Sequence, residues 1–187
     1  PGSLSSAVSA ATGGNSQAVT QIVVAGKINS NDFSIANNYS SCTLVDLSRT
    51  TGVTTVPSWS YSNNSNLTQI FLPACITEIG YRAFYNATAL VALTCHAVTP
   101  PSIGSYAFDG VPEGLVVYVP EKSIELYEQV DGWKDFIILP IQANVHSVEL
   151  NLPDECADGR YKNMGLELVN VKSGQKYKYV VTDRIHY

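Results

Sequence analysis

The chain has 187 residues and a formal net charge of −5, with 11 Lys and Arg against 16 Asp and Glu. Charged residues make up only 14% of the sequence, against a usual share of about 25%, and Ser, Thr and Asn take their place, which is uncommon in a cytosolic enzyme. So few basic residues argue against a nucleic-acid-binding protein, because such proteins concentrate Lys and Arg on one face. The longest apolar run, Phe136–Leu139, is far shorter than the roughly 20 residues of a membrane-spanning helix.

The first predicted element is a short helix over Ser3–Ala11. Its small apolar residues recur at helical spacing, and Gly13 and Gly14 follow it as a stop signal. A stack of structural repeats would expose an apolar face at each end, so we expect this helix to cover the N-terminal edge of the fold that follows.

The sequence then repeats itself across its first two thirds. The motif L-x-x-L-x-L is intact at Leu67–Leu72 and recurs at Leu90–Cys95, where Cys takes the last Leu position. With looser copies, the motif starts lie at 19, 42, 67, 90 and 114, which are 23, 25, 23 and 24 residues apart. This period and strand motif predict an α/β solenoid, a leucine-rich repeat array of about five repeats of 23–25 residues with one short parallel strand each.

A second landmark has the same period. Ile79-Gly80-x-x-Ala83-Phe84 returns 24 residues later at Ile103–Phe108, and a degenerate copy that ends in Ser60-Tyr61 lies 23 residues earlier. The Ala-Phe pair gives each repeat a second wall, and stacked repeats bury both walls in one core. Residues 19–41 lack the pair, so the N-terminal turns should be irregular. The competing interpretation is a β-sandwich with coincidental spacing.

These motifs carry a family resemblance. The two Ile-Gly-x-x-Ala-Phe segments and the closing phrase Val117–Glu121 resemble the BspA-like leucine-rich repeat family of bacterial surface proteins. Asn29-x-x-Asp32-Phe33 resembles the first repeat of such arrays, so the likeness extends over about residues 1–142. The resemblance implies a secreted or cell-surface protein of the Bacteroidetes (Bacteroides) type, extracellular and associated with the outer membrane, that takes part in adhesion.

The array should end in a second cap. Ser123–Asp131 has apolar residues at helical spacing, with Ser123 as the expected N-cap and Gly132 as the stop. Trp133 and Phe136 are the expected plug of the last repeat. The acidic residues of this region are interpreted as a solvated face, with a cation-binding surface as the alternative: Glu121, Glu125, Glu128, Asp131 and Asp135.

Residues 143–187 form a separate, basic-ended segment. Strands are predicted around 148–152, 166–171 and 177–181, with a turn at Ser173-Gly174. We expect this segment to be the start of a β-sandwich module that continues beyond Tyr187, because such modules need about seven strands. The domains are therefore predicted as 1–142 and 143–187. Asp154–Gly159 is interpreted as a polar turn, the alternative being a calcium loop.

No catalytic or metal-binding motif is present in the sequence, and no cofactor is predicted. The three His residues are isolated, and His96 falls at a turn after a core strand. Cys42 and Cys95 occupy Leu positions and are interpreted as buried thiols, with a disulfide as the alternative. Cys75 is a marginal candidate for a nucleophile.

The predicted ligand-binding surface is the concave strand face. In each strand, the residue between the two inward-facing positions faces outward, and these residues form the main column. The neighbouring outward-facing column contributes Gln69. A cover by the C-terminal segment, or plain exposure to solvent, is the alternative. The predicted function is a non-enzymatic, adhesin-like interaction module that binds a host extracellular or bacterial surface protein, or a glycan. The alternatives are a structural spacer and an accessory domain of a larger secreted protein such as a hydrolase. The predicted main column consists of Val23, Asp46, Phe71, Thr94 and Tyr118.

Overall fold

The computed structural model describes residues 4–141, 165–169 and 176–180. Contacts within the chain divide it into two units, residues 1–142 and 143–187. Each unit is described by itself.

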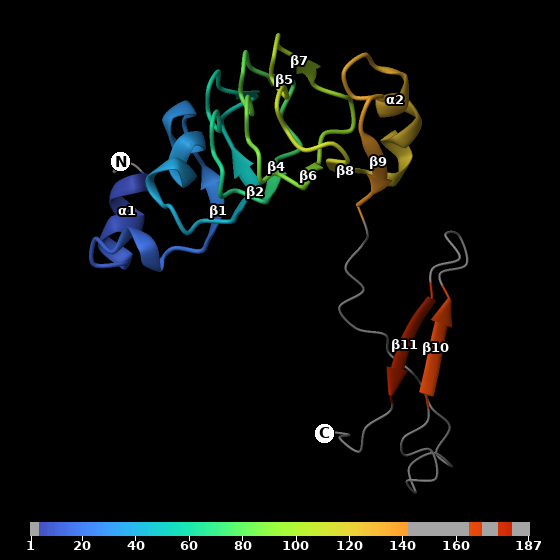
Figure 1. Ribbon diagram of the computed structural model, residues 1–187, viewed down its shortest axis with the longest axis horizontal. Coiled ribbons are helices and arrows are strands. Elements are labelled where there is room, and N and C mark those ends of the chain that lie inside the picture. Colours follow the sequence, from blue (N-terminus) through green and yellow to red (C-terminus); the bar gives the residue numbers. More distant parts are fainter. Residues whose placement is uncertain (1–3, 142–164, 170–175, 181–187) are drawn as a thin grey trace, which may run out of the picture. The chain divides into compact units, whose positions relative to one another are not determined.

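A six-stranded parallel sheet forms one wall of the first unit, with its strands side by side in the order β1-β2-β4-β6-β8-β9 (Figure 1). Each of the first five strands begins two residues after a predicted motif start, and neighbouring strands pair at equivalent motif positions. The predicted repeat solenoid is therefore confirmed. The strands are β1 Gln21–Lys27, β2 Leu44–Thr51, β4 Gln69–Leu72, β6 Ala92–Cys95, β8 Val116–Val119 and β9 Ile137–Pro140.

The second landmark forms the opposite wall. Three two-residue strands, β3 (Thr55–Val56), β5 (Glu78–Ile79) and β7 (Ser102–Ile103), pair in parallel. Gly80 follows β5 at a close approach between two repeats, where a Cβ would lie 2.7 Å from the carbonyl oxygen of Val56. The glycine of the motif is thus required by the spacing of the layers.

The core lies between these walls. The inward strand residues are buried, and Cys42 and Cys95 are buried free thiols, as predicted, in Leu positions. A column of stacked rings runs through the second wall: Tyr61 and Phe84 have centroids 5.3 Å apart, and Phe84 and Phe108 5.2 Å. Tyr61 therefore takes the place of the Phe in the degenerate repeat and continues the stack of rings.

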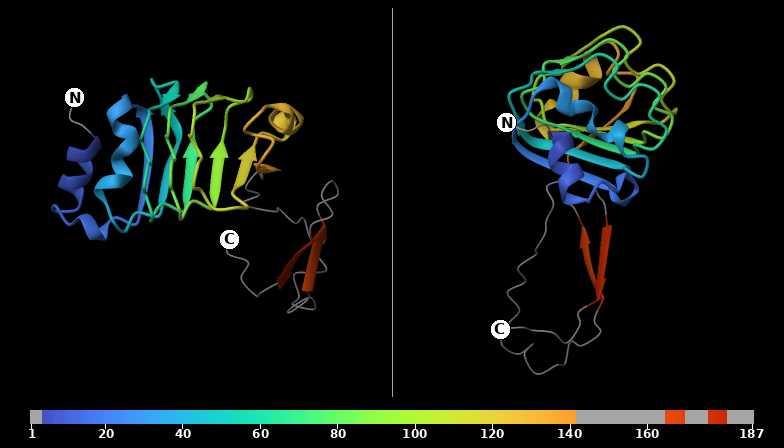
Figure 2. Two further views of the ribbon diagram at one scale, coloured as in Figure 1. Left: turned by 45° about the horizontal axis from the view of Figure 1, so that its top comes forward. Right: turned by 90° about the vertical axis from the view of Figure 1, so that its left-hand side faces the viewer.

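The N-terminal turns are irregular, as predicted. The helix α1 (Leu4–Ala11) lies at one end of the strand stack (Figure 2), and the 3₁₀ segments η1 (Ser16–Ala18) and η2 (Ser30–Asn38) flank β1. Asp32 connects the cap to the array, because its carboxylate accepts hydrogen bonds from the backbone N–H groups of Leu4 (3.1 Å) and Asn29 (3.0 Å). Phe33 is fully buried and supplies the apolar wall in a repeat that lacks Ala-Phe.

The C-terminal cap is shorter than predicted. A 3₁₀ turn, η3 (Glu121–Ser123), leads into α2 (Ile124–Gln129). The predicted N-cap role of Ser123 is wrong: its side chain makes no capping hydrogen bond, and its hydroxyl is buried without a partner. The apolar pattern of the predicted helix includes Leu126 and Val130, but both are exposed, because a helix of six residues brings only Tyr127 fully into the core. All five acidic residues of this region are exposed, as expected of a solvated face.

The predicted plug is confirmed in Trp133 and Phe136. Trp133 is fully buried, and its Nε1 donates a hydrogen bond to the carbonyl oxygen of Pro101 (2.7 Å). Its ring contacts that of Phe108, and the half-buried Phe136 contacts Phe108 as well. Strand β9 was not predicted; it follows the plug and adds a sixth strand to the main sheet.

In the second unit, β10 (Gly165–Val169) and β11 (Lys176–Val180) pair antiparallel, at two of the predicted strands. The strand expected at 148–152, the turn at 173–174, the acidic segment 154–159 and Cys156 lie outside the described residues.

Candidate functional site

The structure brings the predicted column together on the outer face of the main sheet. Val23 pairs with Asp46, Asp46 with Phe71, Phe71 with Thr94, and Thr94 with Tyr118. The two residues that flank each of them along its strand are buried in the core, because side chains alternate between the two faces of a strand. The five side chains therefore form one row across five strands.

The members of this row differ in accessibility. Val23 is 56% exposed, whereas Asp46, Phe71 and Tyr118 are half-buried. Thr94 is only 7% exposed, since it lies in register between the larger side chains of Phe71 and Tyr118. The two aromatic side chains, and not Thr94, supply the accessible surface at the centre of the row.

The next outward column has the same register. Gln69 is exposed and pairs with Leu44 on one side and Ala92 on the other, both half-buried. Strand β9 extends both columns with two exposed apolar residues, Ile137 (50%) and Leu139 (40%). Sequence reasoning missed these two residues because no L-x-x-L-x-L motif introduces β9.

The sheet face carries little charge. Asp46 is the acidic member of the row, and its carboxylate accepts a hydrogen bond from the backbone N–H of Ser48 (2.8 Å). Burial lowers the pKa of His96, which follows β6, and the negative charge of Asp46 partly opposes this shift. The imidazole is therefore neutral at pH 7, and Asp46 is the one charged member of the row.

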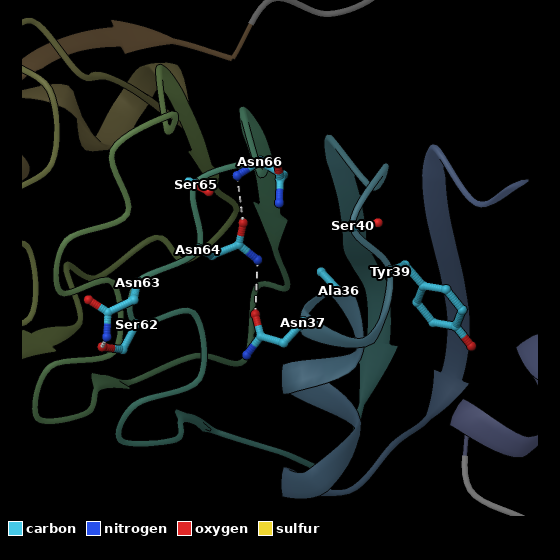
Figure 3. A pocket seen from close by; sticks show the side chains of 9 residues that line it. All are labelled: Ala36, Asn37, Tyr39, Ser40, Ser62, Asn63, Asn64, Ser65 and Asn66. Carbon is cyan, nitrogen blue, oxygen red and sulfur yellow. Dashed lines mark hydrogen bonds between the residues drawn. The ribbon is translucent and has the colours of Figure 1, made fainter. Parts of the chain in front are cut away.

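A polar cavity of about 300 Å³ lies between the end of η2 and the loop before β4 (Figure 3). In it, Nδ2 of Asn64 donates to Oδ1 of Asn37 (2.9 Å), and Oδ1 of Asn64 accepts the backbone N–H groups of Asn66 and Leu67. The ring of Tyr39 points away from these amides. Sequence reasoning missed this cavity, although a run of Asn and Ser marks it. It is lined by Ala36, Asn37, Tyr39, Ser40, Ser62, Asn63, Asn64, Ser65 and Asn66.

Another group of residues, the aromatic–arginine cluster, lies on the turns that follow the short strands. The guanidinium carbon of Arg82 is 4.7–5.2 Å from the ring centroids of Trp59, Tyr81, Tyr85 and Tyr106. Sequence reasoning also missed this cluster. The sequence does carry a signal for it, because large side chains recur at the two variable positions of the Gly-x-x-Ala-Phe landmark.

No arrangement for catalysis is evident in the part of the chain that the structure describes. Within it, no three His, Cys, Asp or Glu side chains gather in a way that could hold a metal ion. The half-buried thiol of Cys75 donates to the carbonyl oxygen of Val53 (3.3 Å), and it has no His partner among the described residues. No described helix has the length and apolarity to cross a bilayer.

Parallel strands that repeat every 23–25 residues, with a second wall of short strands, define a leucine-rich repeat solenoid. Residues 25–130, more than half of the chain, match the family model of the BspA type leucine-rich repeat region in six copies. The chain belongs to this family. No curated protein sequence matches it. The family is typical of surface proteins and of protein-interaction modules, and such repeats are generally non-enzymatic.

Proposed function

We propose that this protein is a non-enzymatic, adhesin-like module of a secreted or cell-surface protein. It binds a host extracellular or bacterial surface protein through the outer face of its main sheet. The observation that carries the proposal is the aligned row on that face, in which Phe71 and Tyr118 flank the small Thr94. Aromatic side chains contribute much of the binding energy at protein interfaces, because a large apolar area is buried by a rigid group.

The dimensions of the sheet constrain the partner. Six strands about 4.8 Å apart, with four residues of about 3.3 Å each, present roughly 24 by 13 Å, or about 300 Å². A stable protein interface takes about 800 Å² from each partner. A protein partner must therefore also contact residues beside the four-residue strands. The additional surface includes the ends of β1 and β2, which are three and four residues longer than the other strands of the sheet.

The test is binding of the chain to a panel of host extracellular matrix proteins and bacterial surface proteins. The variant Phe71→Ala/Tyr118→Ala should weaken binding at least tenfold, since it removes both central contacts. Leu126→Ala is the matched control, because Leu126 is an exposed apolar residue on α2, outside the sheet. Absence of binding at high micromolar protein would overturn adhesion, and unchanged binding by the double variant would overturn the assignment to the sheet face.

The division of the chain into two units favours a second candidate function, that of a spacer or accessory domain in a larger secreted protein such as a hydrolase. A spacer positions its neighbour without a ligand of its own. In that case the Phe71→Ala/Tyr118→Ala variant would leave every interaction of the full-length protein unchanged.

A further inference from the structure

The aromatic–arginine cluster occupies backbone positions that disfavour its residue types. Trp59, Arg82 and Tyr106 are equivalent in successive repeats, and their φ angles are +65°, +51° and +59°. At the second left-handed position of the same turns the chain has Asn63 and Asn86, a residue type that tolerates this conformation. Large side chains kept at strained positions point to a role of the side chains themselves.

The rings of the cluster form a continuous exposed strip. Trp59, Tyr81 and Tyr106 are 47%, 39% and 53% exposed. The centroids of Trp59 and Tyr81 are 5.5 Å apart, and those of Tyr81 and Tyr106 6.1 Å. The rings are in contact with one another, so that nothing can be inserted between them, and a ligand must lie across the strip.

Arg82 gives the strip a positive centre. Its guanidinium lies among four rings, and none of the described carboxylates forms an ion pair with it; Glu78 and Asp109 of neighbouring turns are among those that do not. Its Nε is buried and has no hydrogen-bond partner. A guanidinium in this setting favours a carboxylate, which it can bind through two parallel hydrogen bonds.

The polar cavity adjoins the cluster. The backbone N–H of Asn63, which lines the cavity, donates to the carbonyl oxygen of Tyr85 (2.7 Å), and the Asn63 side chain accepts from Nδ2 of Asn86 (3.0 Å). The amides and hydroxyls of the cavity carry no charge. Those that do not already pair with another described residue, among them the hydroxyls of Ser40 and Ser65, can both donate and accept hydrogen bonds. Groups of this kind match the hydroxyls of a sugar.

We propose that the aromatic–arginine cluster and the adjoining cavity bind an acidic glycan that contains uronate residues. The rings contact the apolar faces of the pyranoses, Arg82 binds a carboxylate, and the Asn and Ser side chains of the cavity bind hydroxyls. A protein is the poorer occupant, because three aromatic side chains of roughly 150–250 Å² each, about half exposed, offer only about 300 Å². The site is separate from the sheet face.

The test is titration of the full chain with oligosaccharides of galacturonate, alginate and hyaluronan, each beside its carboxyl-reduced form. Tryptophan fluorescence reports on Trp59, since Trp133, the other tryptophan of the chain, is buried. We expect saturable binding of at least one acidic form, weakened about tenfold by carboxyl reduction and by Arg82→Gln, because both remove the charged hydrogen bonds. Tyr106→Ala, which removes an exposed ring, should weaken binding as well, and calorimetry provides an independent measurement.

Three results would overturn the proposal. One is the absence of saturation by every acidic oligosaccharide up to about 10 mM. Another is equal affinity for the acidic and the carboxyl-reduced forms, or an affinity that is the same in the wild type and in both the Arg82→Gln and the Tyr106→Ala variants. Circular dichroism checks that the variants are folded. The third is equally tight binding of tetraglutamate, which would show attraction of any anion. Phe71→Ala/Tyr118→Ala should bind the glycan like the wild type, so that a failure here is distinguishable from a failure of the proposed sheet-face function.

Discussion

The column of stacked rings makes Phe84 a sensitive position for the stability of the array. Phe84 is fully buried and stacks on Tyr61 and Phe108 with interplanar angles of 9° and 6°. Replacing a buried Phe by Ala costs about 3–5 kcal/mol, and loss of two stacked neighbours places Phe84→Ala near 4 kcal/mol. At roughly 3–4 °C per kcal/mol for a unit of this size, the melting temperature should fall by about 14 °C.

The measurement is thermal and urea unfolding followed by circular dichroism. Phe71→Ala is the matched control: it removes the same side chain from the half-buried outer face and should cost about 2 kcal/mol. Phe84→Leu keeps most of the volume and should cost about 1–2 kcal/mol. If Phe84→Ala destabilised the protein no more than Phe71→Ala does, the ring column would not be a continuous part of the core.

Three further changes test other parts of the fold. Tyr127→Phe removes a buried hydrogen bond from the hydroxyl to the carbonyl oxygen of Ala97 (2.9 Å) and should lower the free energy of unfolding by about 1–2 kcal/mol in urea titrations; no change would refute that bond. Gly80→Ala places a Cβ 2.7 Å from the carbonyl oxygen of Val56 and should cost about 2–3 kcal/mol, whereas a neutral outcome would contradict the close approach of the repeats. Because burial lowers the pKa of His96 in the folded state, the unfolded chain takes up this proton first and stability falls as the pH drops through about 6.5. The loss of melting temperature between about pH 7.5 and 5.5 should therefore be smaller in His96→Gln, and an equal loss would show that His96 contributes nothing to it.

Much of the array could be predicted from the sequence because its information is local. Within one strand, the alternation of apolar and polar residues determines which side chains face inward, and the period carries this pattern from one repeat to the next. The sequence also shows, for the same reason, that Tyr61 holds the position in its repeat that Phe84 holds in the next. The family model that matches residues 25–130 rests on the same pattern.

Departures from the local pattern could not be predicted in this way. In the repeat of β8 the first motif position is Gly114, which is exposed with a φ of +87°, and its neighbour Leu115 is buried in its place. Phe136 lies directly before β9, as Leu115 lies directly before β8, one residue later than the first motif position of the other repeats. The sixth strand therefore has no recognisable motif. The capping role expected of Ser123 failed because the chain enters α2 through a 3₁₀ turn, which leaves the hydroxyl buried in the core.

For the sites, the sequence by itself determined the members of the outward row on the main sheet, since that row follows from alternation along single strands. Only the tertiary structure decided that Thr94 is covered by its neighbours and that Arg82 is surrounded by four rings. The physical reason is that accessibility and ring contacts arise between repeats about 23 residues apart in the chain, whose side chains meet only when the strands stack about 4.8 Å from one another.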